Sequence, residues 1–133
     1  MQLNITTDYA IRILLFCAIK DDKVSSKEIS ESMGIPKNYV LKIVRQLSAA
    51  GMTASQSGQK GGVSLIKKPE EITLFDVLDV IEPTTKINRC LEADRYCSRF
   101  ATENCPVRNF YCILQNEIET KLKEITIASL LKG

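Results

Sequence analysis

The residues of this chain best suited to chemistry are its cysteines, four of which lie within one short stretch of the 133-residue sequence. Cys90, Cys97, Cys105 and Cys112 follow one another at intervals of seven, eight and seven residues. Thiolates are soft ligands that hold iron–sulfur clusters, whereas structural zinc sites usually include two cysteines separated by only about two to four residues. The wide spacing therefore favours an iron–sulfur cluster wrapped by a loop, with zinc as the alternative metal. A reversible disulfide without any cofactor is the other alternative.

Histidine is absent from the chain, and its absence limits the available chemistry. Ser–His and Cys–His catalytic pairs and histidine-ligated metal sites cannot form without it, and the usual general acid–base is missing. We therefore predict that the protein is not an enzyme. The apolar run 13–19 is too short to span a bilayer, so we expect a cytoplasmic protein with reduced thiols and no membrane partner.

Basic residues are concentrated in the first half of the chain. Between Lys27 and Lys68, seven lysines and arginines stand against two glutamates, although the whole chain carries a formal charge of only +2. A basic segment joined to a neutral or acidic remainder is typical of a protein that binds a polyanion such as DNA.

Capping signals and apolar periodicity predict the elements that position these residues. Thr6 or Thr7 is expected to cap a buried first helix that runs to about Lys20 and holds Cys17 in its core. Later in the chain, Thr73 is expected to cap another helix, which ends before the proline at position 83.

A helix-turn-helix is predicted between these two helices. Ser25 is expected to cap a short helix that ends at Gly34, and Pro36 opens a helix running to about Ala50. The buried stripe of this helix follows the i, i+3, i+4, i+7 rule and comprises Val40, Ile43, Val44 and Leu47. Its outer face is basic, and its expected DNA contacts are Lys37, Tyr39, Lys42 and Arg45. Tyr39 is equally well placed to pack in the core.

A hairpin is predicted next, because two short strands at 52–56 and 63–66 flank a glycine-rich turn. A hairpin after a helix-turn-helix is the wing of a winged helix, and we expect Lys60 and Gly61 near its tip to contact DNA.

The remainder of the chain is a polar loop followed by a helix that Pro106 opens. This final helix is expected to run for about two dozen residues and to pair with its counterpart in a dimer, because it carries one apolar stripe. The predicted fold is therefore mainly α: a winged helix-turn-helix with a two-stranded wing and a long C-terminal dimerisation helix. Its regions are a DNA-binding part (1–82), a cysteine-rich cofactor loop (83–105) and the dimerisation helix (106–133).

Several motifs together resemble the winged-helix repressor family that includes the iron–sulfur regulator IscR, the nitric-oxide sensor NsrR and the cysteine-metabolism regulator CymR. They are TTDYAIR (6–12), IPKNYV (35–40), KGGVSL (60–65), EITLFDV (71–77) and the cysteine loop. The resemblance spans nearly the whole chain. It implies a homodimer that reads a roughly palindromic double-stranded DNA operator, with the state of a bound cluster controlling DNA affinity.

The resemblance also implies the ligands of the cluster. Members with this loop bind an iron–sulfur cluster through three cysteines, which match Cys90, Cys97 and Cys105, and through one further ligand. Asp8 is the expected fourth ligand, donated by the second subunit as in NsrR-like members, and Cys112 is the rival. An ordinary helix pair between Asp8 and Arg12 four residues later is the structural alternative.

Two departures from the family pattern affect these expectations. Many members have an arginine before the first wing glycine, but this chain has Ser57, so Lys60 is expected to supply a phosphate contact instead. The missing histidine excludes the IscR type of site, in which histidine is the fourth ligand. The predicted protein is a repressor that senses iron–sulfur, redox or nitric-oxide status through a 2Fe–2S or 4Fe–4S cluster. The alternatives are a cluster-free thiol regulator and a zinc-stabilised interaction module.

Overall fold

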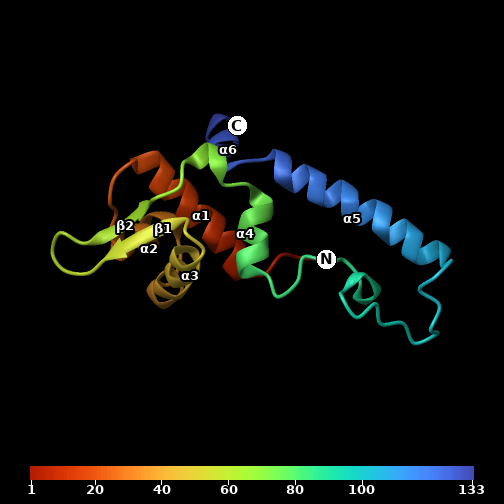
Figure 1. Ribbon diagram of the computed structural model, residues 1–133. Helices are drawn as coiled ribbons and strands as arrows, with labels where there is room; N and C mark the ends of the chain where they lie inside the picture. The colour runs from red at the N-terminus through yellow and green to blue at the C-terminus, as the bar shows by residue number, and fades with distance from the viewer.

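Local signals in the sequence set most of the helix boundaries in the computed structural model, which describes all residues 1–133 (Figure 1). The helices are α1 (Ile5–Lys20), α2 (Ser26–Met33), α3 (Lys37–Ala49), α4 (Leu74–Ile81), α5 (Pro106–Glu124) and α6 (Ile127–Lys132), with short 3-10 turns η1 (Pro69–Glu71) and η2 (Arg89–Leu91). The strands β1 (Thr53–Gln56) and β2 (Gly62–Leu65) pair antiparallel, with Gln56 opposite Gly62 nearest the turn. The mainly α winged helix with a two-stranded wing is therefore confirmed.

The predicted caps of α2 and α4 are present. The Ser25 hydroxyl accepts the Glu28 backbone N–H, and Gly34 ends α2 in the left-handed conformation (φ 66°). Thr73 and Asp76 form a reciprocal capping box at the start of α4. These caps satisfy backbone N–H groups that have no partner inside the helix.

One hydrophobic core holds the winged helix together. Its 17 buried residues, which include Ile127 of α6, come from α1, α2, α3, β2, α4 and the segments that connect them. The predicted stripe of α3 lies in this core, with Val40, Ile43 and Leu47 fully buried. Burial of this stripe determines which face of α3 is turned to solvent.

The prediction that Thr6 or Thr7 caps α1 is wrong. The helix begins at Ile5 after Asn4, and Thr7 is fully buried in the first turn instead of capping it. The Glu82 carboxylate takes the place of a local cap, because its oxygens accept hydrogen bonds from the Asn4 backbone N–H, the Asn4 amide and the Thr7 hydroxyl at 2.7–2.8 Å. An acidic group at a helix N-terminus also compensates the helix dipole.

Substitution of Glu82 by alanine is expected to lower the free energy of unfolding by about 1–3 kcal/mol, because it leaves the buried Thr7 hydroxyl without a partner. Urea unfolding followed by circular dichroism measures this change. Asp79→Ala changes an exposed acidic residue of α4, three positions before Glu82, and is the matched control. Its free energy of unfolding should stay within about 0.5 kcal/mol of that of the parent protein. Equal stability of the Glu82→Ala and Asp79→Ala proteins would contradict a capping role for Glu82.

The continuous terminal helix predicted from Pro106 is interrupted. Helix α5 ends at Glu124, and Ile125–Ile127 run extended beside Ile72–Leu74, with the Leu74 N–H donating to the Ile125 carbonyl and the Ile127 N–H to the Ile72 carbonyl. Thr126 then caps α6 through a capping box with Ser129. The chain end therefore packs back on the winged helix, and α5 projects from it together with the cysteine loop (Figure 1).

Helix α5 lies apart from the core and extends away from the winged helix, as Figure 1 shows. Gln115 is its only buried residue, while Val107, Phe110 and Ile113 expose 54–62% of their surface. The cysteine loop runs outward from α4 to the far end of α5, which then leads back toward the winged helix (Figure 1). None of the helices combines the length and the apolar character needed to cross a membrane.

Candidate cluster pocket and DNA-binding face

Three of the clustered cysteines line one pocket between the loop and the first turns of α5. Cys90, Cys97 and Cys105 all contribute to this pocket of about 360 Å³, which we call the cysteine pocket. Cys112 does not line it and is exposed on α5. The loop thus brings together the three residues that the family resemblance assigns as ligands.

Tight turns in the loop bring these residues together. Arg95, Phe100 and Asn104 adopt left-handed backbone conformations with φ of 51–58°, which reverse the chain over a few residues. The Phe100 N–H bonds to the Cys97 carbonyl at 3.0 Å. Cys105 stands immediately before Pro106, outside α5.

Each of the three sulfurs has an N–H donor nearby. Asn88 donates its amide to the Cys90 sulfur at 3.2 Å, and the Arg108 backbone N–H donates to the Cys105 sulfur at 3.4 Å. Backbone N–H groups of Ala101 and Arg99 lower the pKa of Cys97 below its ordinary value. Hydrogen bonds of this kind stabilise thiolates, which are the form that binds metal.

Basic side chains surround the same pocket. Arg89, Arg99 and Arg108 line it, and the Arg108 guanidinium also donates to the Cys90 carbonyl at 3.3 Å. Arg89 is paired with Asp94 by two hydrogen bonds. The remaining positive charge suits an anionic occupant, such as a thiolate-bound cluster. Sequence analysis missed Arg108 because its role depends on a contact with a residue eighteen positions earlier.

The pocket is not a preformed site for a single metal ion. No three cysteine, aspartate or glutamate side chains lie close enough together to hold one ion. The donor set nevertheless fits an iron–sulfur cluster, because three soft thiols line one cavity that is much larger than a single ion requires. This arrangement does not favour the zinc alternative.

Asp8 lies on α1 and does not line the cysteine pocket of its own chain. Its carboxylate pairs with Arg12 at 2.5 Å, which is the structural alternative that the sequence left open. Nearly half of the Asp8 side-chain surface, 47%, is exposed, so a second subunit can reach it.

The basic face of α3 is exposed, as predicted. Lys37, Lys42 and Arg45 are exposed, and they share this face with Leu41, whose surface is 47% exposed. Tyr39 is half-buried, and its ring packs edge-on against Tyr9 with ring centroids 5.6 Å apart. The structure therefore places Tyr39 at the edge of the core.

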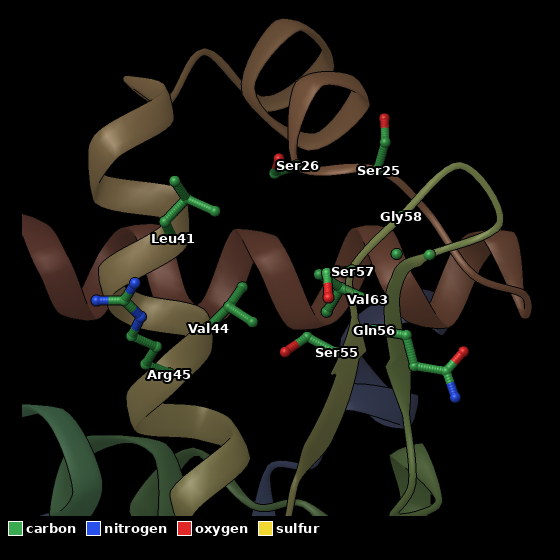
Figure 2. A pocket seen from close by; sticks show the side chains of 12 residues that line it. Ser25, Ser26, Leu41, Val44, Arg45, Ser55, Gln56, Ser57, Gly58 and Val63 are labelled. Carbon is green, nitrogen blue, oxygen red and sulfur yellow. The ribbon is translucent and has the colours of Figure 1, made fainter.

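A second pocket, of about 440 Å³, separates α3 from the wing. Figure 2 shows Leu41, Val44 and Arg45 along the α3 side, and Ser55, Ser57 and Gly58 along the wing side. Its polar lining and its position between helix and wing suit a strand of the DNA backbone. Lys60 at the wing tip is exposed and Gly61 half-buried.

Comparisons with known proteins agree with this arrangement. The sequence model of the Rrf2 family, described as iron-dependent transcriptional regulator, matches residues 3–133. An HTH-type transcriptional regulator of Aquifex aeolicus is 32% identical over 132 residues, which cover 98% of this chain and 92% of that protein. The protein aau3 of Rhizobium meliloti is 38% identical over 94 residues, covering 70% of this chain and 61% of that protein.

Solved structures with the same fold are less similar in sequence. CymR of B. subtilis, described as the global cysteine regulator, has a TM-score of 0.81 at 23% identity, with 98% of this chain and 95% of that chain covered. IscR of T. potens has a TM-score of 0.77 at 23% identity, with 99% and 87% covered.

The family match and the Aquifex relative, together with the winged helix, show a DNA-binding transcriptional regulator and not an enzyme. The chain belongs to the Rrf2 family of transcriptional regulators.

Proposed function

We propose that this Rrf2-family regulator is a homodimeric repressor whose affinity for its operator is controlled by an iron–sulfur cluster. Cys90, Cys97 and Cys105 would hold the cluster, and Asp8 of the second subunit would complete it. The observation that carries this proposal is that these three cysteines line one pocket while Cys112 lies outside it. The arginines of the pocket support it, since a cluster bound by thiolates is an anion.

The exposed apolar residues of α5 support the dimer. Phe110 and Ile113 expose 57% and 62% of their surface, on a side of α5 that the rest of the chain leaves uncovered. A second copy packing along α5 would remove this surface from water, and a two-fold axis would present two recognition helices to a palindromic site.

Contacts around Asp8 provide a route from the cluster to the recognition helix. Arg12, which pairs with Asp8, also donates to the carbonyl of Met33 at the end of α2 and lies over the Tyr9 ring. Tyr9 in turn packs against Tyr39 on α3. Transfer of Asp8 from Arg12 to a cluster would therefore change the contacts that support the α2–α3 turn.

Purification without oxygen, followed by ultraviolet–visible spectroscopy and analysis of iron, sulfide and zinc, tests the proposal. A brown protein with matched iron and sulfide that bleaches in air or nitric oxide is the expected result. Colourless protein without iron, even after reconstitution, would refute the cluster.

A cluster-free thiol switch is the second candidate, and the lowered pKa of Cys97 favours it. Backbone N–H groups of Ala101 and Arg99 lower this pKa, and the expected disulfide would form among Cys97, Cys105 and Cys112, of which Cys105 lines the same pocket as Cys97. The thiol switch predicts a colourless protein whose DNA affinity changes with added oxidant and reductant. The same preparation therefore distinguishes the two candidate functions.

The proposed DNA contacts of α3 predict different salt responses for two neighbouring residues. Lys42→Ala should weaken operator binding and reduce the slope of log affinity against log salt by about 0.9, as the loss of one phosphate contact does. Leu41→Ala should leave the slope unchanged, because it removes an exposed apolar side chain of the same face and no charge.

Fluorescence anisotropy with operator DNA at several salt concentrations measures both effects. An unchanged slope in Lys42→Ala would exclude a phosphate contact, and a reduced slope in Leu41→Ala would show that the slope does not report the lost charge.

A further inference from the structure

The only buried residue of α5 is a glutamine. Gln115 exposes 6% of its surface, although its helix exposes large apolar residues such as Phe110 and Ile113. A buried amide group is costly unless all its hydrogen bonds are made. Both polar atoms of the Gln115 amide have hydrogen-bond partners.

The partners of Gln115 lie in the segment that leads into the cysteine loop. Its side-chain oxygen accepts the Ile87 N–H at 2.8 Å, and its side-chain nitrogen donates to the Thr85 carbonyl at 2.9 Å. The Gln115 side chain therefore binds one backbone N–H and one backbone carbonyl, two residues apart, as the backbone of a neighbouring β-strand would. Only an amide side chain offers a donor and an acceptor side by side in this way.

Glu119, one turn further along α5, reinforces the contact. It accepts a hydrogen bond from the Gln115 amide at 3.1 Å and forms an ion pair with Lys86 at 3.2 Å. Residues 85–87 are thus held along α5 by both backbone and side-chain contacts. We call this set of contacts the glutamine clamp.

The glutamine clamp binds residues 85–87, which lie shortly before Cys90 in the chain. Asn88, whose amide donates to the Cys90 sulfur, directly follows the clamped segment, and Arg108 holds the Cys90 carbonyl from the first turns of α5. Gln115 itself does not line the cysteine pocket, and ten residues of chain separate it from Cys105, about 15 Å along a helix. It therefore acts on the pocket only through the segment that it binds.

We propose that Gln115 is a positioning residue that holds Cys90 in the cysteine pocket by binding residues 85–87 against α5. This placement of Cys90 follows from contacts within the chain, and its use in holding a cluster rests on the proposed function. Without the clamp, the segment before Cys90 separates from α5, and the thiol, which is 9% exposed in the structure, becomes accessible to solvent.

The alkylation rate of each cysteine tests this role in the reduced, metal-free, full-length protein. The protein is treated with a limiting amount of iodoacetamide, and each thiol is quantified by mass spectrometry. In Gln115→Leu, the rate at Cys90 is expected to rise about tenfold, the change that corresponds to the loss of roughly one net buried hydrogen bond. Gln115→Glu keeps the acceptor for the Ile87 N–H but loses the donor, so it should show a smaller rise.

Cys17 serves as the internal reference for folding. It is 2% exposed in the core of the winged helix, and burial raises its pKa to about 11, so it reacts only when that core opens. The exposed neighbour Asn116, replaced by alanine, is the matched control and should leave all rates unchanged.

A rise at Cys90 with an unchanged rate at Cys17 supports the glutamine clamp. An unchanged rate at Cys90 in Gln115→Leu overturns it, and so does an equal rise at Cys17 and Cys90, since Gln115 would then support the whole fold. Because no cluster is present in this experiment, a failure of the clamp and a failure of cluster binding are separate results.

Discussion

Each of the substitutions Cys90→Ser, Cys97→Ser and Cys105→Ser is expected to abolish cluster binding, whereas Cys112→Ser is expected to preserve it. Each of the first three substitutions removes a thiolate from the cysteine pocket, and a hydroxyl is a poor replacement for a soft ligand. We expect iron and sulfide contents and visible absorption to fall by at least about tenfold in each. Cys112→Ser removes a thiol of the same chemistry from an exposed position outside the pocket, which makes it the matched control.

The fourth ligand is tested in the same series. Asp8→Ala should retain a cluster with an altered absorption spectrum and faster loss of iron, because the three thiolates of the pocket remain. Arg12→Ala is its control, since it removes the partner of Asp8 but leaves the carboxylate. Loss of the cluster in Cys112→Ser, together with unchanged behaviour of Asp8→Ala, would assign the fourth position to Cys112 instead.

Gly61→Ala is expected to weaken operator binding by tenfold or more. The backbone shape of the wing, as well as its charge, is then needed for DNA binding. A Cβ atom at this position would lie 2.1 Å from the carbonyl oxygen of Gln56 and 2.8 Å from the carbonyl carbon of Ser57, so the backbone of the turn must move. Rebuilding the turn would shift Lys60, which the turn carries and which is expected to contact the DNA backbone. Fluorescence anisotropy with operator DNA measures the loss.

Lys60→Ala separates the two effects, because it removes the charge and keeps the turn. It should lower the salt slope by about 0.9 with a smaller loss of affinity than Gly61→Ala. The hairpin is anchored beyond the turn by a pair of hydrogen bonds between Val24 and Val63, at 2.7 and 2.9 Å, so the helices of Gly61→Ala should stay folded. Parental affinity in Gly61→Ala would show that the wing does not contact DNA.

Sequence pattern by itself determined the DNA-binding half. The apolar spacing of α3, the Ser25 and Thr73 caps and the glycine-rich wing turn are local signals, and each produced the expected element. They succeed because a cap or an apolar stripe acts within one or two turns of its own helix. The same holds for the loop position of the first three clustered cysteines, which lie among turn-forming and charged residues.

Contacts between distant segments decided the rest. The cap of α1 comes from Glu82, 78 positions after Asn4, and α5 ends where Ile125 pairs with Leu74. Periodicity continued the apolar stripe of α5 through Ile125, and the local signal of the break, the capping box of Thr126 and Ser129, was missed.

The cysteine pocket shows the same division. Spacing and residue type identified the thiols, but only the tertiary structure separated Cys112 from the other three and revealed Arg108 and Gln115 beside the loop. A polar side chain acquires such a role from the backbone groups that packing brings to it. The sequence therefore determined which residues carry the chemistry, and the tertiary structure decided which of them share a site, since hydrogen bonds across tens of residues form only after the helices have packed.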